Sequence, residues 1–520
     1  MTQVFVRLRL TSTFALSARF KGHRADHWSS KAKKKPKDKA LDHFDDFYQS
    51  VYGKGWPDIR EALLQEKSKY LAVVNNFSDS ERVREELESL GAIDLRSIYK
   101  VQKELLEEEE FLDEQNGKKR APGKKQIDRE MSSFLSKKQL SELESIYPAD
   151  SNVEATSLRE VEELKAKSLN ELDENEGFDL KVTEPLQPVT LKSIESEVEI
   201  ELDSSRIITP SSGLTLSALQ EYIPATKLKG LEDFILESEH YSYYKQGSDF
   251  TVTIEKEPSM SIPKHLTMYT FEEMNNSRFK SAKRGSTGVV DYYLLDGGSV
   301  LPVLALDLQP GDRILDMCAA PGGKSFCAIQ TLFPSLIVMN DVLPKRVKRI
   351  HEVIEQCLSA LDEWGGRLLI TQNDARIIED KNVFNKILVD VPCTNDRHSL
   401  HSDDGNWFKS VYIKERLKLP ELQTDILVNA LKLVSVGGTV VYATCSLSPV
   451  QNDGVVQMAL KKAFEEAKVV MVVKDISKGL KPLECLYNFG NYGLKYGHIV
   501  IPTMGNNWGP MYFCKMTRVK

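Results

Sequence analysis

Short apolar runs separated by amphipathic stretches dominate the chain from residue 288 to residue 444. The runs that have the character of buried strands are RILDM (313–317), LIVMN (336–340), RLLIT (367–371), KILVD (386–390) and GTVVYAT (438–444). Between them, 344–361 and 416–434 have helical periodicity. Nearly continuous apolar strands that alternate with helices are typical of a parallel sheet covered on both faces. The pattern predicts a doubly wound, Rossmann-like α/β fold.

The N-terminal hundred residues follow a different pattern. Apolar positions recur at helical spacing through LDHFDDFYQSVYG, WPDIREALLQEKSKYLAVVNNF and SDSERVREELESLG, which predicts an N-terminal helical region over 26–100. Residues 1–25 are rich in Ser and Thr and carry Arg and Lys with no acidic residue before Asp26. That composition is typical of a mitochondrial presequence, and a disordered basic tail is the alternative.

Residues 101–230 predict an acidic, mostly disordered insertion. Within 101–210, 27 Asp and Glu oppose 15 Lys and Arg, a charge of −12, whereas the whole chain carries −7. The remaining residues therefore carry +5, so the acidic average does not exclude a nucleic-acid partner. High charge with few aromatic residues disfavours a packed core. A solvated linker is the favoured interpretation, and a partner-binding segment is the alternative.

Cysteine usage and hydropathy exclude several classes of protein. The seven cysteines are odd in number and lack paired short spacings, which argues against a disulfide scaffold and against a zinc site. A reducing compartment fits free thiols better. No apolar run is long enough to cross a bilayer. We therefore expect neither a membrane span nor a metal.

The first predicted strand leads into a glycine turn, LDMCAAPGGKS (315–325). Gly322 and Gly323 open a helix there, and glycine lets the backbone approach a ligand closely. Asp341 follows the second strand, where an acid accepts hydrogen bonds from ribose hydroxyls, and Asp374 follows the third, within reach of an adenine amine. A packed turn is the alternative. Together these residues indicate an adenosine cofactor, and S-adenosylmethionine fits better than NAD because the turn offers no pyrophosphate cradle.

Two thiols follow the fourth and fifth strands, Cys393 in DVPCTNDR and Cys445 in YATCSLSP. Carbon 5 of a pyrimidine is weakly nucleophilic, and addition of a thiolate to carbon 6 activates it. Either thiol is a candidate for that addition, and the other for releasing the product. Asp390 lies three residues before Cys393. A protonated carboxyl there would hydrogen-bond N3 of cytosine, a role that needs the raised pKa of a dry pocket.

These motifs, with ATCSLSPVQND, resemble the signatures of the Nop/Sun (NSUN) family of RNA 5-methylcytosine methyltransferases. The resemblance covers roughly 240–520 and is most like the family's mitochondrial ribosomal-RNA members, through stretches such as YYLLDGGSVLPVLAL, DRHSLH and NWGPMYFCKM. It implies a class I, S-adenosylmethionine-dependent RNA methyltransferase domain over 240–520.

The resemblance also ranks the site residues. It implies that Cys445 is the nucleophile and that Cys393 helps to free the product. The positions that match the family's cofactor contacts are Gly322, Gly323, Lys324, Asp341, Arg346, Asp374 and Asp390.

The family further implies cytosine methylation of mitochondrial ribosomal RNA, of the small or the large subunit, in the mitochondrial matrix. It also implies ribosome biogenesis as the process and a partner protein of the mitochondrial transcription-termination-factor (mTERF) family. A structural assembly factor whose catalysis is dispensable is the alternative from another class. The second cysteine motif disfavours a DNA methyltransferase.

Overall fold

Two β-sheets organise the part of the chain that the structure describes. This computed structural model describes residues 34–66, 68–116, 250–275, 277–359, 364–490 and 492–520. The predicted presequence (1–25) and most of the predicted insertion lie outside these residues. The strands are β1 (Leu71–Val74), β2 (Ile93–Asp94), β3 (Ile254–Lys256), β4 (Met268–Thr270), β5 (Tyr292–Leu295), β6 (Arg313–Asp316), β7 (Leu336–Asn340), β8 (Leu368–Thr371), β9 (Lys386–Asp390), β10 (Thr439–Thr444), β11 (Met471–Asp475), β12 (Phe489–Gly490), β13 (His498–Val500) and β14 (Met511–Arg518).

The larger sheet is the parallel sheet that the apolar runs predict. Its order is β12-β13-β14-β10-β9-β6-β7-β8, and β11 pairs with both β14 and β3. Neighbours from β10 to β8 are parallel, whereas β14 runs antiparallel to β10. The five predicted strands are confirmed as β6 to β10, so the carboxyl ends of these strands meet along one edge of the sheet.

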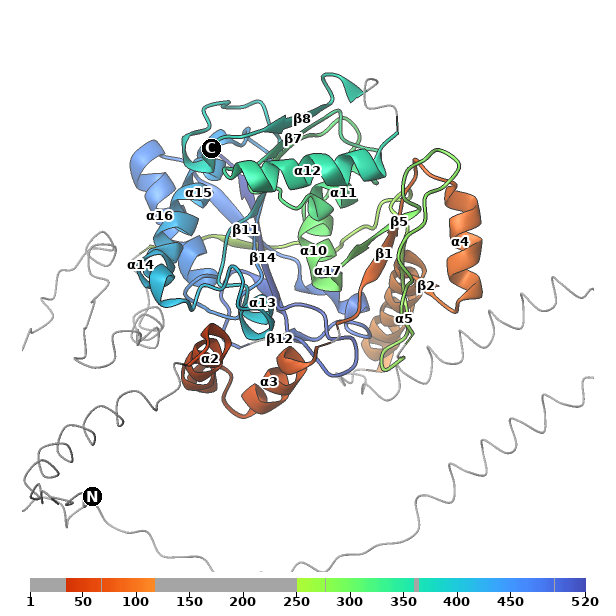
Figure 1. The fold of residues 1–520 in the computed structure, drawn as a ribbon, viewed down its shortest axis with the longest axis horizontal. Helices are drawn as coiled ribbons and strands as arrows, with labels where there is room; N and C mark the ends of the chain where they lie inside the picture. Colours follow the sequence, from red (N-terminus) through yellow and green to blue (C-terminus); the bar gives the residue numbers. More distant parts are fainter. Residues whose placement is uncertain (1–33, 67, 117–249, 276, 360–363, 491) are drawn as a thin grey trace, which may run out of the picture. The chain divides into compact units, whose positions relative to one another are not determined.

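Helices cover both faces of this sheet. The α-helices are α2 (Pro36–Tyr52), α3 (Trp56–Leu64), α4 (Ser80–Ser89), α5 (Leu95–Asn116), α10 (Gly297–Ala305), α11 (Gly323–Ile329), α12 (Pro344–Cys357), α13 (Asp396–His401), α14 (Ile413–Leu417), α15 (Leu419–Leu433), α16 (Asp453–Ala467) and α17 (Ser477–Leu480). Figure 1 shows α15 and α16 packed together on one side of the sheet and α10 and α11 packed together on the other. This arrangement confirms the predicted doubly wound fold.

The core lies between the sheet and the α15–α16 layer. Leu315, Ile387 and Val440, from three neighbouring strands, are buried against Leu427 of α15 and Val456 of α16. Each such side chain contributes about 1.5–3 kcal/mol when fully buried. This packing holds the strand ends of β6, β9 and β10 at fixed positions, and the functional residues follow those ends.

A second, smaller sheet corrects the prediction of a wholly helical N-terminal region. Its order is β2-β4-β1-β5, and β1 pairs antiparallel with both β4 and β5. Residues 71–74, LAVV, are a fully buried strand rather than the end of a helix. The prediction failed because a short apolar run has no periodicity that separates strand from helix, and the pairing partner lies about 200 residues further along the chain.

The N-terminal boundary of the predicted insertion is also corrected. Helix α5 continues to Asn116, sixteen residues into the segment expected to be mostly disordered from 101. Lys100 pairs with Glu104, and Lys103 with Glu107, at the i,i+4 spacing that supports a helix. Residues 117–249 lie outside the described residues.

The N-terminal helices pack next to the first cysteine motif. Helices α2 and α3 both contact α13, the short helix that follows Cys393 (Figure 1). In α2, Phe44, Phe47 and Tyr48 are buried, and Phe44 meets Phe408 edge to face with ring centroids 5.2 Å apart. The N-terminal segment therefore contributes to the wall of the region that contains the thiols.

Candidate active site

The glycine turn after β6 forms the floor of the site. Gly322 has φ +111°, in the left-handed region that favours glycine, and it precedes the first residue of α11. A Cβ at Gly323 would lie 2.9 Å from Leu295 Cδ1 and 3.0 Å from Tyr293 Cε1. The two glycines thus serve different purposes, since the first makes the turn and the second lets α11 pack against β5.

Lys324 joins this turn to the end of β9. Its Nζ donates to Asp390 Oδ2 at 2.7 Å, and both side chains are largely buried. Burial alone would lower the pKa of Lys324, but the charge and hydrogen bond of Asp390 outweigh it and leave that pKa raised. The protonated carboxyl expected at Asp390 stays a prediction. The structure adds that the Lys324 ammonium is the hydrogen-bond donor to this carboxyl.

Asp316, the last residue of β6, lies beneath the turn. Ser325 Oγ donates to its Oδ2 at 2.5 Å, while its Oδ1 is buried without a hydrogen-bond partner. Burial raises the pKa of Asp316 to about 7. Sequence analysis did not select this residue, although its position at a strand end was the available signal.

Asp341 and Arg346, which are both predicted to contact the cofactor, meet at the end of β7. Arg346 Nε lies 3.1 Å from Asp341 Oδ2, and Arg346 Nη2 donates to the carbonyl of Ala320 in the glycine turn. Asn340 was missed by sequence analysis. Its side chain donates to the carbonyls of Met317 and Asn373, which ties the ends of three strands together.

Asp374 follows β8 as expected, but its carboxylate is already engaged. It accepts from Arg376 Nη2 at 2.6 Å and from the Arg376 backbone N–H. These hydrogen bonds lower the pKa of Asp374. That this carboxylate accepts a hydrogen bond from an adenine amine stays a prediction, because in this structure it accepts hydrogen bonds from Arg376.

The two thiols converge beyond the ends of β9 and β10. Asp390 and Ala443 are directly paired across these parallel strands, and the Val391 N–H donates to the Ala443 carbonyl. Cys393 and Cys445 therefore emerge at the same level of the sheet. Their Sγ atoms lie 2.9 Å apart, and the Cys445 N–H donates to Cys393 Sγ at 3.3 Å.

The electrostatics around Cys445 favour the protonated thiol. Its pKa is raised well above the ordinary value, first by the hydrogen bond with Cys393 and next by burial, with Asp390 adding to the effect. Lys324 acts in the opposite direction. All seven cysteines of the chain are free in the structure, and these two are in hydrogen-bond contact with each other.

Behind the thiols lies a buried carboxylate that sequence analysis missed. Asp396 Oδ2 accepts from Tyr48 Oη and from the Leu447 N–H, each at 2.7 Å. Its Oδ1 accepts from Thr394 Oγ1 at 2.7 Å and from Ser446 Oγ at 3.2 Å. Burial raises the pKa of Asp396, and these donors oppose that rise. Nothing in the local sequence revealed that Tyr48 would reach this carboxylate.

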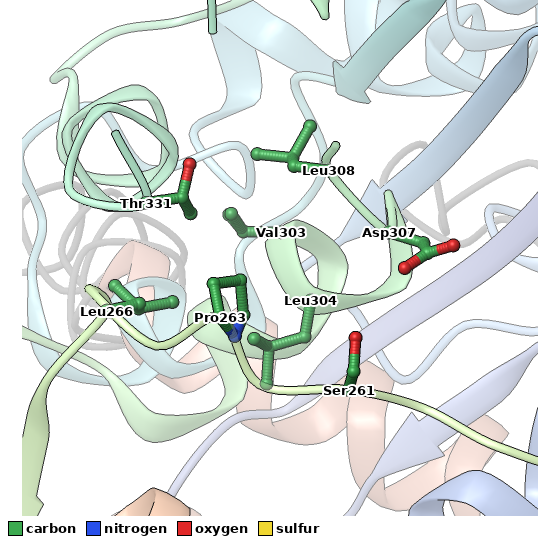
Figure 2. A pocket seen from close by; sticks show the side chains of 8 residues that line it. All are labelled: Ser261, Pro263, Leu266, Val303, Leu304, Asp307, Leu308 and Thr331. Atoms are coloured by element: carbon green, nitrogen blue, oxygen red, sulfur yellow. The ribbon is translucent and has the colours of Figure 1, made fainter. Parts of the chain in front are cut away.

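A surface pocket elsewhere in the fold is not part of this site. Figure 2 shows its lining side chains, Ser261, Pro263, Leu266, Val303, Leu304, Asp307, Leu308 and Thr331. Leu308 precedes β6 and Thr331 precedes β7, so the pocket lies at the edge of the sheet where those strands begin. The thiols lie at the edge where the strands end.

Within the described parts of the chain, no cluster of three or more His, Cys, Asp or Glu side chains could hold a metal ion. No described helix has the length and apolar character that a membrane span needs.

Comparison with known proteins gives consistent matches. The family described as "16S rRNA methyltransferase RsmB/F" matches residues 303–483. The Caenorhabditis elegans protein named "5-cytosine rRNA methyltransferase nsun-4" is 33% identical over 499 residues, which cover 94% of each chain. The Mus musculus protein named "5-cytosine rRNA methyltransferase NSUN4" is 38% identical over 290 residues, or 55% of this chain and 75% of the relative.

Other matches cover less of the chain. The Xenopus laevis protein of the same name as the mouse one is 40% identical over 257 residues, or 49% of this chain and 63% of the relative. Among solved structures, that of NSun6 from Pyrococcus horikoshii with SFG is 24% identical, with a TM-score of 0.35 over 44% of this chain and 54% of that one.

Proposed function

Because the chain belongs to the RsmB/F (Nop/Sun) family of 5-cytosine rRNA methyltransferases, we propose that it methylates carbon 5 of a cytosine in ribosomal RNA with S-adenosylmethionine as the methyl donor. The observation that carries the proposal is the 2.9 Å separation of Cys393 Sγ and Cys445 Sγ beside the Lys324–Asp390 pair. Addition to a pyrimidine requires a nucleophile such as a cysteine thiolate, and a second thiol in contact with it can assist the later release of the product.

The residues at the strand ends fit the cofactor. Asp316 has one buried carboxyl oxygen without a partner, which suits an ammonium group such as that of the methionine portion. Asp341 suits the ribose hydroxyls, and Gly322 lets the backbone approach the ligand. When bound, S-adenosylmethionine supplies an electrophilic methyl group. Arg346 fixes Asp341 against the glycine turn, so the residues that hold the cofactor are positioned before it arrives.

In the first chemical step, the Cys445 thiolate attacks carbon 6 of the cytosine. A bond forms between Sγ and carbon 6, and the electron pair of the 5,6 double bond moves toward N3. The Lys324–Asp390 pair receives this charge, since its ammonium donates a hydrogen bond or a proton at N3. Carbon 5 would then form its bond to the methyl group that the cofactor supplies, while the bond from that methyl to the cofactor's sulfur would break and the sulfur would keep its electron pair. The target base has to leave its stack to reach the thiol.

Release reverses the addition. A base removes the proton from carbon 5, the 5,6 double bond forms again, and the bond between carbon 6 and Cys445 Sγ breaks. We assign the proton removal to Cys393, because its Sγ is in contact with Cys445 Sγ and follows the same strand as Asp390. The departing Cys445 thiolate then takes up a proton.

We place this activity in the mitochondrial matrix, acting on ribosomal RNA of the small or the large mitoribosomal subunit during ribosome assembly. Support comes from the composition of residues 1–25 and from the relatives' names, which include a mitochondrial tRNA cytosine methyltransferase of Mus musculus, 34% identical over 259 residues. A partner of the mTERF family remains part of the proposal. The alternative, an assembly factor that binds RNA and whose catalysis is dispensable, is disfavoured by the intact pair of thiols.

The test combines an in vitro and a cellular measurement. Purified protein with labelled cofactor should methylate a cytosine-containing ribosomal RNA, and Cys445→Ala should not. Bisulfite sequencing of mitochondrial RNA after depletion should show the loss of a ribosomal 5-methylcytosine that wild type restores and Cys445→Ala does not. Restoration of that mark by Cys445→Ala would overturn the mechanism. Normal ribosome assembly with Cys445→Ala would instead favour the assembly-factor alternative.

A further inference from the structure

We propose that Asp396 is a positioning residue that holds the two thiol loops together, and that Tyr48 of the N-terminal helix α2 takes part in this positioning through its hydrogen bond to Asp396. The thiol loops are the segments after β9 and β10 that contain Cys393 and Cys445. The proposal deepens the function above and rests on it. Asp396 is the first residue of α13, at the end of the loop that contains Cys393, whereas Tyr48 lies 348 residues away in the sequence. The buried contact between their side chains is therefore a tertiary feature of the fold.

Two of the donors to Asp396 belong to the residues that directly follow the two cysteines in the sequence. Thr394 directly follows Cys393, and Ser446 directly follows Cys445. Both hydroxyls donate to Asp396 Oδ1, at 2.7 and 3.2 Å, and their Oγ atoms are 3.0 Å apart. One carboxylate oxygen therefore bridges the residues next to the two thiols.

Backbone contacts add to this bridge. The Leu447 N–H donates to Asp396 Oδ2, and the Asp396 N–H donates to the carbonyl of Cys445 at 3.3 Å. Asp396 is fully buried, so water does not compete for these bonds, and hydrogen bonds to a buried carboxylate are among the strong ones. If the carboxylate fixes both loops, the contact between the two Sγ atoms depends on it.

Tyr48 supplies the donor that comes from outside both loops. Its hydroxyl donates to Asp396 Oδ2 at 2.7 Å, and its ring is buried. The same helix offers a matched control in Tyr52, whose hydroxyl donates to the carbonyl of Leu447 at 2.6 Å rather than to the carboxylate. The two tyrosines thus donate from the same helix to the segments that follow the two thiols, but only Tyr48 donates to the carboxylate of Asp396.

The first test compares Tyr48→Phe with Tyr52→Phe in the full chain. Loosening a reacting group lowers the rate without changing substrate affinity, so Tyr48→Phe should lower kcat about tenfold or more while KM for RNA changes less than about twofold. Tyr52→Phe should leave both parameters within about twofold of wild type. Equal effects of the two variants on kcat would show that α2 only docks, and would overturn the proposal.

The second test reads the distance between the thiols without any activity. Diamide oxidises two neighbouring thiols to a disulfide, taking up their two protons and two electrons to become a hydrazine. Mass spectrometry after a timed exposure measures the fraction of Cys393–Cys445 disulfide. Wild type and Tyr52→Phe should form it fast, and Tyr48→Phe several-fold more slowly. Unchanged disulfide formation in Tyr48→Phe would overturn the proposal whether or not the chain methylates RNA.

A second pair of variants guards against failure of Tyr48→Phe to fold. Thr394→Val keeps the shape of the side chain but removes its donor, whereas Thr394→Ser keeps the donor and removes a methyl group. The proposal expects slow disulfide formation and low kcat for Thr394→Val and recovery of most of both for Thr394→Ser. The reverse order would show that packing at this position matters rather than the hydrogen bond to Asp396, and the proposal would fail.

Discussion

The carboxyl group of Asp316 permits a quantitative test of the way burial shapes this site. It lies at the end of β6, is 1% exposed, and has a single side-chain donor, Ser325 Oγ. Burial raises its pKa from 3.8 to about 7. Folding therefore disfavours the ionised form of this carboxyl. Asp316→Asn removes the ionisation and keeps a side chain of the same shape with an oxygen that accepts from Ser325.

The sign and size of the effect follow from the two pKa values. Between about pH 4 and pH 7 the folded protein binds the proton of Asp316 and the unfolded chain does not, so the free energy of unfolding falls as the pH rises. The full shift corresponds to about 4 kcal/mol, of which roughly 2.6 kcal/mol falls between pH 5 and pH 8. Asp316→Asn lacks this loss. The free energy of unfolding of the variant minus that of wild type should therefore increase by roughly 2.6 kcal/mol between pH 5 and pH 8.

The assay is urea denaturation of full-length wild type and Asp316→Asn, without cofactor, in steps of one pH unit across that range. A constant offset between the two proteins reflects the changed hydrogen bonds, and only the slope of the difference reports ionisation. Ser325→Ala provides a directional check. The Ser325 hydroxyl lowers the pKa of Asp316, so its removal should extend the fall in stability to higher pH. A difference between Asp316→Asn and wild type that stays flat with pH would refute the argument from burial.

Three further outcomes are expected. Cys393→Ala should accumulate a covalent adduct with cytosine-containing RNA on a denaturing gel and Cys445→Ala should form none, whereas equal adduct from both would reverse the assigned roles. Lys324→Met removes a charge that lowers the pKa of Cys445. Iodoacetamide should therefore alkylate this thiol more slowly at neutral pH, and the pH at which alkylation becomes fast should rise. An unchanged pH profile of alkylation would contradict the argument that Lys324 lowers this pKa. Residues 1–40 fused to a fluorescent reporter should direct it to mitochondria, and a cytosolic signal would defeat the presequence prediction.

The parallel sheet was accessible from sequence because its strands are short, apolar and bounded by helices. Strands β6, β7, β9 and β10 are buried along much of their length, so the apolar pattern alone marks them, whereas β8 is only partly buried. The rule that ligands lie beyond the carboxyl ends of such strands then directed attention to Asp341, Cys393 and Cys445. Sequence position predicted their convergence, since both cysteines closely follow the carboxyl ends of strands that are parallel and paired.

What the sequence did not reveal depends on contacts between distant segments. The pairing of β1 with β5 joins residues on either side of the predicted insertion, and no local pattern encodes such a pairing. Asp374 was placed correctly along the chain, but Arg376, two residues later, captures its carboxylate. Asp396 looked like an ordinary polar residue in a loop. Its four donors come from three separate segments, so only the folded structure identifies it.

The opposing charges around Cys445 suggest how the site avoids reacting before its substrate arrives. The Cys393 contact and burial hold the pKa of Cys445 well above its ordinary value, so the free protein keeps this thiol protonated and weakly nucleophilic. Lys324 is the charge that opposes them, yet Asp390 binds it. In the proposed mechanism, a cytosine whose N3 accepts a hydrogen bond from Lys324 would weaken that ion pair, so the ammonium would stabilise the Cys445 thiolate more strongly. The base itself would then activate the nucleophile, and Lys324 would link recognition of N3 to addition at carbon 6.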